Sequence, residues 1–272
     1  MTDIPVPPRI LAIAGSDSSG GAGIQADIKT ITMLGGYAMT AITAVTAQNT
    51  LGVKQVETLS PSMLAAQIEC CVSDIGVDAV KIGMLGSPQI AEIAASHLRD
   101  IDAAVVFDPV MVATSGAVLA DEDTIAAFRL LMDRATLVTP NLPELEALTG
   151  LPCTTQDEIY QAAATLVERH SCHVLAKGGH SRTERVLDLL VRSDGSAVAF
   201  DHARIETRHT HGTGCTLSSA IATLLGHGQG IDHAVRLARK FVFGALQAAP
   251  GFGSGHGPMG HQALRGRAQS SS

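Results

Sequence analysis

Short apolar runs alternate with segments of helical periodicity along most of this chain, and that alternation restricts the fold more than any other feature. Strands are expected over Arg9–Ala14, Thr40–Thr46, Ala79–Ile82, Ala104–Phe107, Leu137–Thr139 and His173–Ala176, with an antiparallel excursion over Val186–Val191 and Ala197–Phe200. Helices are expected between them, from about Ala22, Ser60, Ser87, Asp121, Asn141 and Thr155, and then over Thr213–Leu225 and Asp232–Ala248. Such a pattern predicts an α/β sandwich with a mostly parallel central sheet and helices on both faces.

Composition agrees with a single domain over residues 1–272, with a flexible tail from about residue 262. The chain is 46% apolar and 17% charged, which is sufficient for a large buried core. A net charge of −7 argues against nucleic acid as a partner, and no apolar window approaches the roughly 18 residues of a membrane span. The five cysteines form no CxxC pair, so we expect a soluble cytoplasmic protein with neither zinc nor disulfides.

The segment His211–Cys215 (HGTGC) lies just before an apolar-periodic stretch that predicts a helix. Two glycines at a helix start allow successive backbone N–H groups to point at one anion. A cysteine in the first turn, Cys215, is expected to have its thiol pKa lowered from about 8.5, and could then take a proton from a substrate hydroxyl. The alternative is an ordinary glycine turn beside a buried cysteine.

Polar residues follow several of the predicted strands, at the edge of the sheet where ligands bind in folds of this class. Asp108 ends one strand, and Asn141 and Glu144 follow another. Oxygen ligands of this kind suit Mg²⁺, although Asn141 and Glu144 also match a helix capping box. Lys177 follows a further strand, where its ammonium could meet a nucleotide phosphate.

The glycine-rich stretch Gly20–Gly23 does not have the spacing of a dinucleotide-binding motif. Asp27, in the helix that follows, lies on the flank of an apolar stripe. A buried carboxylate there must be met by a polar ligand or a backbone donor. Gln48 and Asn49 follow the next strand and add amide groups beside the same helix. Together these residues indicate a polar, planar ligand.

Seven sequence blocks, in order over about residues 9–260, resemble the hydroxymethylpyrimidine/phosphomethylpyrimidine kinase family of thiamine biosynthesis. The blocks are Gly15–Asp27, Thr46–Thr50, Lys81–Leu85, Asp108–Met111, Thr139–Glu144, Lys177–His180 and His211–Ser218.

The resemblance implies a ribokinase-like three-layer fold and a homodimer that uses ATP and Mg²⁺. It implies phosphorylation of 4-amino-5-hydroxymethyl-2-methylpyrimidine to the monophosphate and then to the diphosphate. Substrate contacts are implied for Gln48, Asp27, Met84 and Gly15. The same resemblance places Cys215, Gly212, Thr213 and Gly214 at the reaction centre, Lys177, Asn141 and Thr213 at the nucleotide, and Asp108 and Glu144 around the metal.

Two other functions fit parts of the pattern. A pyridoxal or dual-specificity kinase shares the fold and can share the cysteine, although Gln48 and Asn49 favour a pyrimidine. A non-catalytic pyrimidine or nucleotide sensor would use the same pocket, but it would not need the set Asp108, Glu144, Lys177 and Cys215.

Overall fold

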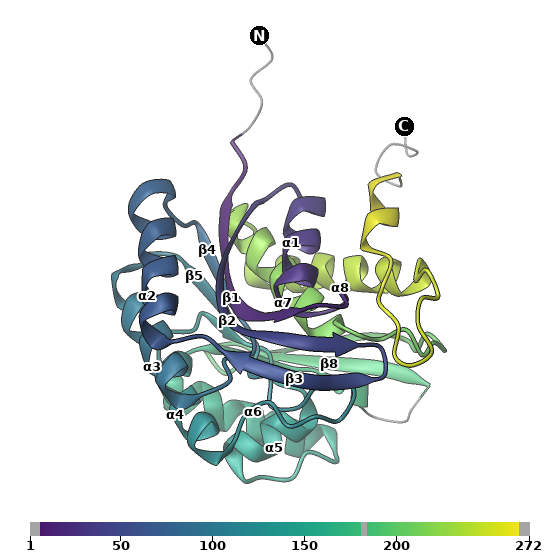
Figure 1. The fold of residues 1–272 in the computed structure, drawn as a ribbon. Helices are drawn as coiled ribbons and strands as arrows, with labels where there is room; N and C mark the ends of the chain where they lie inside the picture. The colour runs from purple at the N-terminus through teal and green to yellow at the C-terminus, as the bar shows by residue number, and fades with distance from the viewer. Residues whose placement is uncertain (1–5, 181–183, 267–272) are drawn as a thin grey trace.

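The structure, a computed structural model, describes residues 6–180 and 184–266. Their strands form a nine-stranded sheet in the order β3-β2-β1-β4-β5-β6-β7-β8-β9 (Figure 1). The six neighbouring strands β2, β1, β4, β5, β6 and β7 are parallel, whereas β3 at one edge and β8 and β9 at the other pair antiparallel. Their bounds are β1 Arg9–Asp17, β2 Tyr37–Asn49, β3 Gly52–Thr58, β4 Ala79–Ile82, β5 Ala104–Phe107, β6 Leu137–Val138, β7 His173–Ala176, β8 Arg185–Val191 and β9 Ala197–Ala203.

Helices cover both faces of this sheet, so the predicted three-layer arrangement is confirmed. The helices are α1 Gly23–Met33, α2 Pro61–Cys70, α3 Pro88–His97, α4 Glu122–Met132, α5 Leu142–Thr149, α6 Gln156–His170, α7 Thr213–Gly226 and α8 Ile231–Gln247. One hydrophobic core lies under α2 to α6, and the other under α1, α7 and α8.

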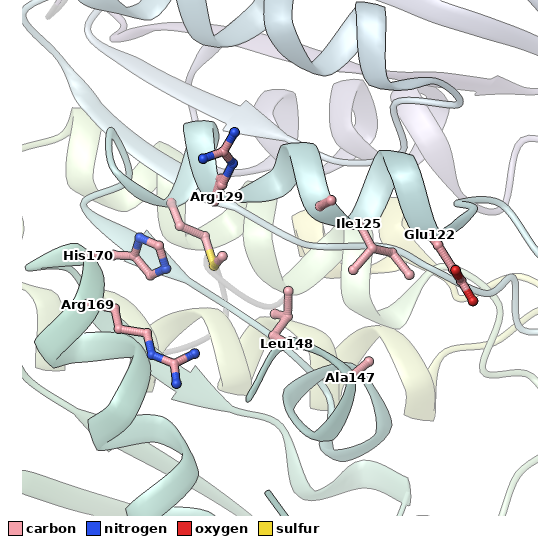
Figure 2. Close-up of a pocket in the computed structure, with 9 residues that line it drawn as sticks. Glu122, Ile125, Arg129, Ala147, Leu148, Arg169 and His170 are labelled. Carbon is pink, nitrogen blue, oxygen red and sulfur yellow. The ribbon is translucent and has the colours of Figure 1, made fainter. Parts of the chain in front are cut away.

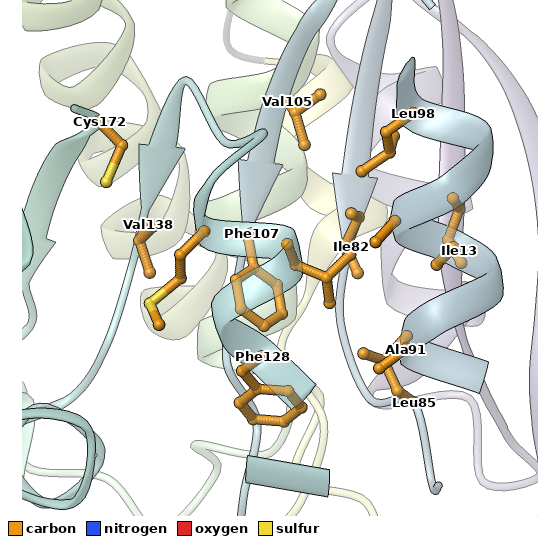
Figure 3. Close-up of a cluster of buried hydrophobic side chains, with 14 of the residues drawn as sticks. Ile13, Ile82, Leu85, Ala91, Leu98, Val105, Phe107, Phe128, Val138 and Cys172 are labelled. Carbon is orange, nitrogen blue, oxygen red and sulfur yellow. The ribbon is translucent and has the colours of Figure 1, made fainter. Parts of the chain in front are cut away.

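The sequence of the central strand β1 is continuously apolar rather than alternating, because each of its faces packs on one of the two cores. Leu11 and Ile13 belong to the first core, while Ile10 and Ala12 belong to the second. Both faces of the strand are therefore buried, as expected for a parallel sheet between two helical layers. Within the first core, the rings of Phe107 and Phe128 pack edge to face, with their centroids 5.2 Å apart (Figure 3).

Several helix starts are fixed by local chemistry that is visible in the sequence. The side chains of Ser60, Ser87, Asp121 and Thr155 each accept a hydrogen bond from a backbone N–H in the first turn of α2, α3, α4 and α6. These caps satisfy donors that a helix leaves unpaired at its N-terminus. The predicted starts of these helices agree with the structure to within one residue or two.

Some boundaries differ from the sequence predictions. Strand β1 continues to Asp17, three residues beyond the expected end, because its last residues pair with β2. Strand β3 was not expected, since most of its residues are exposed and it is held by pairing with β2. The helix expected from about Ser60 is α2, which ends at Cys70 and continues as a π-helical turn over Cys71–Ile75.

The C-terminal part of the described chain is a 3-10 helix, His261–Gly266, that packs on α1 and α8. The expected tail from residue 262 therefore begins within this helix, and residues 267–272 lie outside the described residues. In the ranges 6–180 and 184–266, no helix is long and apolar enough to cross a membrane.

Candidate active site

The glycine turn before α7 lies where several strands end. Gly212 is the N-cap of α7 and has a left-handed φ of 84°, which favours glycine. A Cβ on Gly212 would lie 1.9 Å from the carbonyl oxygen of Gly21. A Cβ on Gly214 would lie 3.2 Å from Asp108 Oδ2 and 3.5 Å from Lys177 Nζ. Three separate sequence blocks therefore converge at the N-terminus of one helix, as predicted.

Asp108 and Lys177 form an ion pair at the site, called here the open pair. Lys177 Nζ donates to Asp108 Oδ1 at 2.6 Å and lies 4.0 Å from Glu144 Oε2. Thr139 Oγ1 also donates to Asp108 Oδ1, at 3.0 Å. The lysine is partly accessible while both carboxylates are buried. Two carboxylates thus face one ammonium, which leaves this corner short of positive charge.

Glu144 and Asn141 form the capping box that the sequence allowed as an alternative to a metal site. Asn141 N donates to Glu144 Oε2, and Glu144 N donates to Asn141 Oδ1. Burial is the main reason that the pKa of Glu144 rises to about 7, and the nearby Asp108 adds to the rise while Lys177 opposes it. Glu144 therefore caps α5 through its hydrogen bond with Asn141, and Lys177 does not fully neutralise the negative charge that Glu144 and Asp108 bring to the site.

Cys215 lies in the first turn of α7, as predicted, but the expected lowering of its thiol pKa is wrong. Burial raises that pKa to about 11, and although Lys81 opposes the rise, Asp27 and Asp108 add to it. A helix N-terminus favours a thiolate, but here loss of solvent and two neighbouring carboxylates outweigh it. The thiol is protonated in the ligand-free protein near neutral pH.

Asp27 does not face the candidate site, contrary to the substrate contact that the resemblance implies. It is fully buried, and its two carboxylate oxygens each lie 2.9 Å from Lys81 Nζ, while Ser219 Oγ donates to Oδ1 at 2.6 Å. We call this the sealed pair. Burial alone would lower the pKa of Lys81, but the adjacent Asp27 raises it, so the lysine is charged. With these partners, Asp27 has no oxygen directed at a ligand.

Lys81 belongs to the block Lys81–Leu85, but no role was predicted for it. A lysine inside the buried strand Ala79–Ile82 is itself a signal, because such a position demands a charged partner. The other omitted residues are Ser219 and Thr139, whose hydroxyl groups gave no comparable signal.

The expected substrate residues Gln48, Met84 and Gly15 lie on the β1–β2–β4 side of the turn. A Cβ on Gly15 would lie 3.0 Å from Met84 Sδ, so these two residues are in contact. Gln48 is partly exposed, and its Nε2 lies 3.3 Å from Nε2 of His211, the residue before Gly212. Gln48 therefore lies beside the turn before α7, while Gly15 and Met84 contact each other.

A separate cavity of about 540 Å³ lies among α4, α5 and the end of α6 (Figure 2). It is lined by residues such as Ile125, Arg129, Leu148 and Arg169. None of the residues that the sequence singled out for chemistry lines this cavity. Among the described residues, no group of three or more histidine, cysteine, aspartate or glutamate side chains could hold a metal ion without other ligands.

Comparison with known proteins decides the family. The family model for phosphomethylpyrimidine kinase matches residues 17–260. The chain belongs to the phosphomethylpyrimidine kinase family. The resemblance inferred from the seven blocks is thereby confirmed.

Two relatives extend this match over nearly the whole chain. A hydroxymethylpyrimidine/phosphomethylpyrimidine kinase of Haemophilus influenzae is 42% identical over 260 residues, covering 94% of this chain and 97% of the relative. A kinase of the same name from Bacillus subtilis is 44% identical over 261 residues, covering 94% and 96%.

Solved structures confirm the ribokinase-like fold. A phosphomethylpyrimidine kinase from Clostridium difficile matches with a TM-score of 0.77 and 39% identity, over 87% of this chain and 98% of that one. An ADP complex of Bacillus subtilis pyridoxal kinase matches with a TM-score of 0.88 and 35% identity, over 96% and 99%. Shape alone thus does not separate the two kinds of kinase, and the substrate side of the site must do so.

Proposed function

We propose that this chain phosphorylates 4-amino-5-hydroxymethyl-2-methylpyrimidine with ATP, first to the monophosphate and then to the diphosphate, in thiamine biosynthesis. The observation that carries the proposal is the convergence of the turn Gly212–Cys215 with Asp108 and Lys177. Phosphoryl transfer depends mainly on positioning and on stabilising negative charge. An N–H-lined turn beside a lysine provides both.

In the first step, the substrate hydroxyl oxygen forms a bond to the γ-phosphorus while the bond from that phosphorus to the ADP oxygen breaks. The backbone N–H groups of Gly212, Thr213 and Gly214 stabilise charge on the transferring group, and Lys177 and Asn141 bind the nucleotide. Cys215, as the thiolate, accepts the hydroxyl proton. Since its thiol pKa is about 11 in the free protein, this role requires the proton to leave when the ligands bind.

The second step asks less of Cys215. Its nucleophile is a phosphate oxygen of the monophosphate, which is already ionised near neutral pH because the second pKa of a phosphate monoester is about 6. No general base is needed for such a nucleophile. Cys215 therefore serves the first phosphorylation more than the second.

Asp108 and Glu144 are the residues that would hold Mg²⁺. Their fit is supported by the charge imbalance of the open pair, where two buried carboxylates face one ammonium and the pKa of Glu144 is raised to about 7. Mg²⁺ binds proteins through one or two carboxylates and completes its shell with water and phosphate oxygens. Bound there, it would neutralise charge on the ATP phosphates.

A pyridoxal kinase is the second candidate, because pyridoxal kinases match this fold closely. The partly exposed amide of Gln48, next to His211, favours the aminopyrimidine, since an amide can donate to a ring nitrogen and accept from an amino group. A non-catalytic sensor has no specific observation in its favour.

The decisive experiment incubates the purified protein with ATP, Mg²⁺ and either the aminopyrimidine or pyridoxal, and resolves mono- from diphosphate by chromatography. We expect both pyrimidine phosphates in sequence, and far slower turnover of pyridoxal. A preference for pyridoxal would transfer the assignment to the second candidate. Binding of the pyrimidine without consumption of ATP would leave the sensor.

We also infer a cytoplasmic homodimer. Apolar side chains are exposed along the β2–β3 edge of the sheet, with Leu51 70% exposed and Val45 and Val56 also accessible, and such a patch favours association. Light scattering coupled to gel filtration, with Leu51→Glu as the matched variant, tests the dimer. A wild-type protein of monomer mass would contradict it.

A further inference from the structure

Lys177 comes directly after β7, and both peptide groups that flank its Cα are hydrogen-bonded. On one side, the backbone N–H of Lys177 donates to the carbonyl oxygen of Pro140 at 2.8 Å. On the other side, the backbone N–H of Gly178 donates to Oδ1 of Asp188, a residue of β8, at 2.8 Å. The two bonds hold both peptide planes, and they therefore fix the direction in which the lysine side chain leaves the backbone.

The bond from Gly178 goes to a side chain at a point where the strand ladder has ended. The pairing of β7 with β8 ends at Ala176 and Leu189. Beyond that pair, a Cβ on Gly178 would lie 1.9 Å from the carbonyl oxygen of Leu187, so only glycine fits this close to β8. The Asp188 carboxylate is therefore the group that continues the attachment of this segment to β8.

Arg239 of α8 holds the other oxygen of that carboxylate. Its Nε donates to Asp188 Oδ2 at 2.7 Å, and both side chains are largely buried. Its Nη2 lies 2.7 Å from His202 Nδ1, which is the acceptor because a guanidinium has only donors. The guanidinium also lies over the ring of Phe200, 5.5 Å from the centroid. Three partners thus fix Arg239, and Arg239 in turn fixes the Asp188 carboxylate.

The two oxygens of Asp188 serve Gly178 and Arg239, so this carboxylate acts on the site through backbone and not through contact with a ligand. We propose that Asp188 and Arg239 are positioning residues, which hold the peptide between Lys177 and Gly178 so that the lysine ammonium is directed at the nucleotide phosphates. The role rests on the proposed function, in which Lys177 binds the nucleotide. The alternative is an ion pair that only joins β8 to α8.

A second ion pair joins the same two elements at the opposite end of β8 and provides the control. Arg192, the residue after β8, donates through Nε to Asp232, in the first turn of α8, at 3.0 Å. Because β8 is antiparallel to β7, Arg192 lies near the start of β7, and Lys177 lies beyond its other end. Arg192→Met therefore weakens the contact between β8 and α8 without reaching Lys177.

The test is a double-mutant cycle on kcat at saturating ATP, with whichever substrate the wild type phosphorylates, corrected for the folded fraction. Asp188→Asn leaves one amide oxygen for two donors, the N–H of Gly178 and that of Arg239 Nε. We expect kcat to fall about tenfold or more, since a small displacement of a group at the reaction centre is costly in rate. In a Lys177→Met background the same substitution should have no further effect, because its action passes through the lysine.

Three results would overturn the proposal. One is an unchanged kcat in Asp188→Asn. Another is a further fall of the same size in the Lys177→Met background, which would show that Asp188 acts independently of the lysine. The third is an equal loss of kcat in Arg192→Met, for which we expect lower stability but normal turnover of the folded protein. If Asp188→Asn does not fold, Arg239→Ala, which opens the carboxylate to water, replaces it in the cycle.

A rescue variant separates the hydrogen-bond pattern from the charge. In Asp188→Asn combined with Arg239→Gln, the glutamine oxygen takes the position of the arginine Nε and accepts from the asparagine amide N–H. The asparagine oxygen is then left for the N–H of Gly178. We expect most of the lost kcat to return although the ion pair is gone. No recovery would overturn the positioning role of Arg239.

Hydrogen exchange of the Gly178 amide needs no substrate and is decisive even if the proposed function fails. We expect slow exchange in the ligand-free wild type, fast exchange in Asp188→Asn, and slow exchange again in the rescue variant. Fast exchange in the wild type would overturn the positioning role. Failure of the wild type to phosphorylate either the aminopyrimidine or pyridoxal would overturn only the proposed function.

Discussion

The sealed pair and the open pair join the same kinds of group at neighbouring positions in the fold, yet they differ in what surrounds them. Lys81 and Asp27 are fully buried, and Ser219 donates a further hydrogen bond to the Asp27 carboxylate. Lys177 is partly accessible, and it faces a second carboxylate, Glu144, as well as Asp108. The first pair is balanced and closed, whereas the second carries excess negative charge and opens to the site.

The sealed pair therefore has a structural role, whereas the open pair can take part in binding and catalysis. A balanced buried pair has nothing left to offer a ligand, and it holds α1, β4 and α7 at fixed positions. An unbalanced pair can still bind ligands: in the proposed function Asp108 and Glu144 would hold a divalent cation, and Lys177 would bind a phosphate. Charges of both pairs shift the pKa of the Cys215 thiol: Lys81 lowers it, whereas Asp27 and Asp108 raise it.

Cys215→Ala gives the largest expected effect. If the thiolate is the base, the first phosphorylation should slow by roughly 10²–10⁴-fold, while the second slows much less because its nucleophile is already ionised. In the wild type kcat/KM for the first step should also rise with pH above 7, because kcat/KM reports the free protein, whose thiol pKa is about 11. Quenched-flow assays of each step measure this, with the exposed Cys70→Ala as control. Equal losses in both steps would reduce Cys215 to a structural role.

Lys81→Met breaks the sealed pair and should lower the free energy of unfolding by about 3–5 kcal/mol, because an uncompensated carboxylate remains buried. Replacing both partners, in Lys81→Met with Asp27→Leu, should restore most of that loss. Urea unfolding measures both, and Lys240→Met, at an exposed lysine of α8, is the matched control. If the single variant matches that control, the two pairs do not differ as described.

Lys177→Met, in the open pair, should reduce catalysis more than stability, the opposite of Lys81→Met. We expect kcat to fall roughly 10²–10³-fold, as when one donor to a developing charge is removed. The loss of unfolding free energy should be smaller than in Lys81→Met, because the site is partly accessible and Glu144, whose pKa is about 7, can bind a proton in place of the lost ammonium. Steady-state assays and urea unfolding on the same preparations test this. A variant that unfolds easily but turns over normally once folded would show that the open pair is also structural.

Glu144 gives a pH dependence with a definite sign. Its pKa rises from 4.5 to about 7 on folding, so between these values the folded protein binds more protons than the unfolded one. Stability from this group is therefore fully present below pH 4.5 and lost as pH rises through 7, by roughly 3 kcal/mol. Glu144→Gln should lack this component when unfolding is measured at pH 5 and pH 8. Identical pH profiles for the two proteins would refute the raised pKa.

Sequence patterns predicted the buried parts of the fold closely. The bounds of β4, β5 and β7 agree with the predicted runs, because strands buried on both faces are continuously apolar. Strand β3 escaped prediction because its residues are mostly exposed and its structure depends on pairing with β2. A pattern of local residues contains no information about such a partner.

The site was predicted better in position than in chemistry. The blocks brought Gly214, Asp108 and Lys177 together, since the ends of parallel strands meet at one edge. Asp27 was misassigned because its partner Lys81 is 54 residues away in sequence. The thiol pKa of Cys215 was misjudged because a helix start is visible in a sequence, whereas desolvation depends on the completed fold.

The hydrogen bond from Ser219 to Asp27 spans 192 residues, and this has a consequence for synthesis of the chain. Asp27 and Lys81 leave the ribosome early, but α7, which completes their burial, follows much later. Domains form as cooperative units, and contacts of such long range close late. The nascent chain must therefore keep these two charges hydrated until α7 has emerged, and a kinase truncated before this helix should remain a substrate for chaperones rather than a partial enzyme.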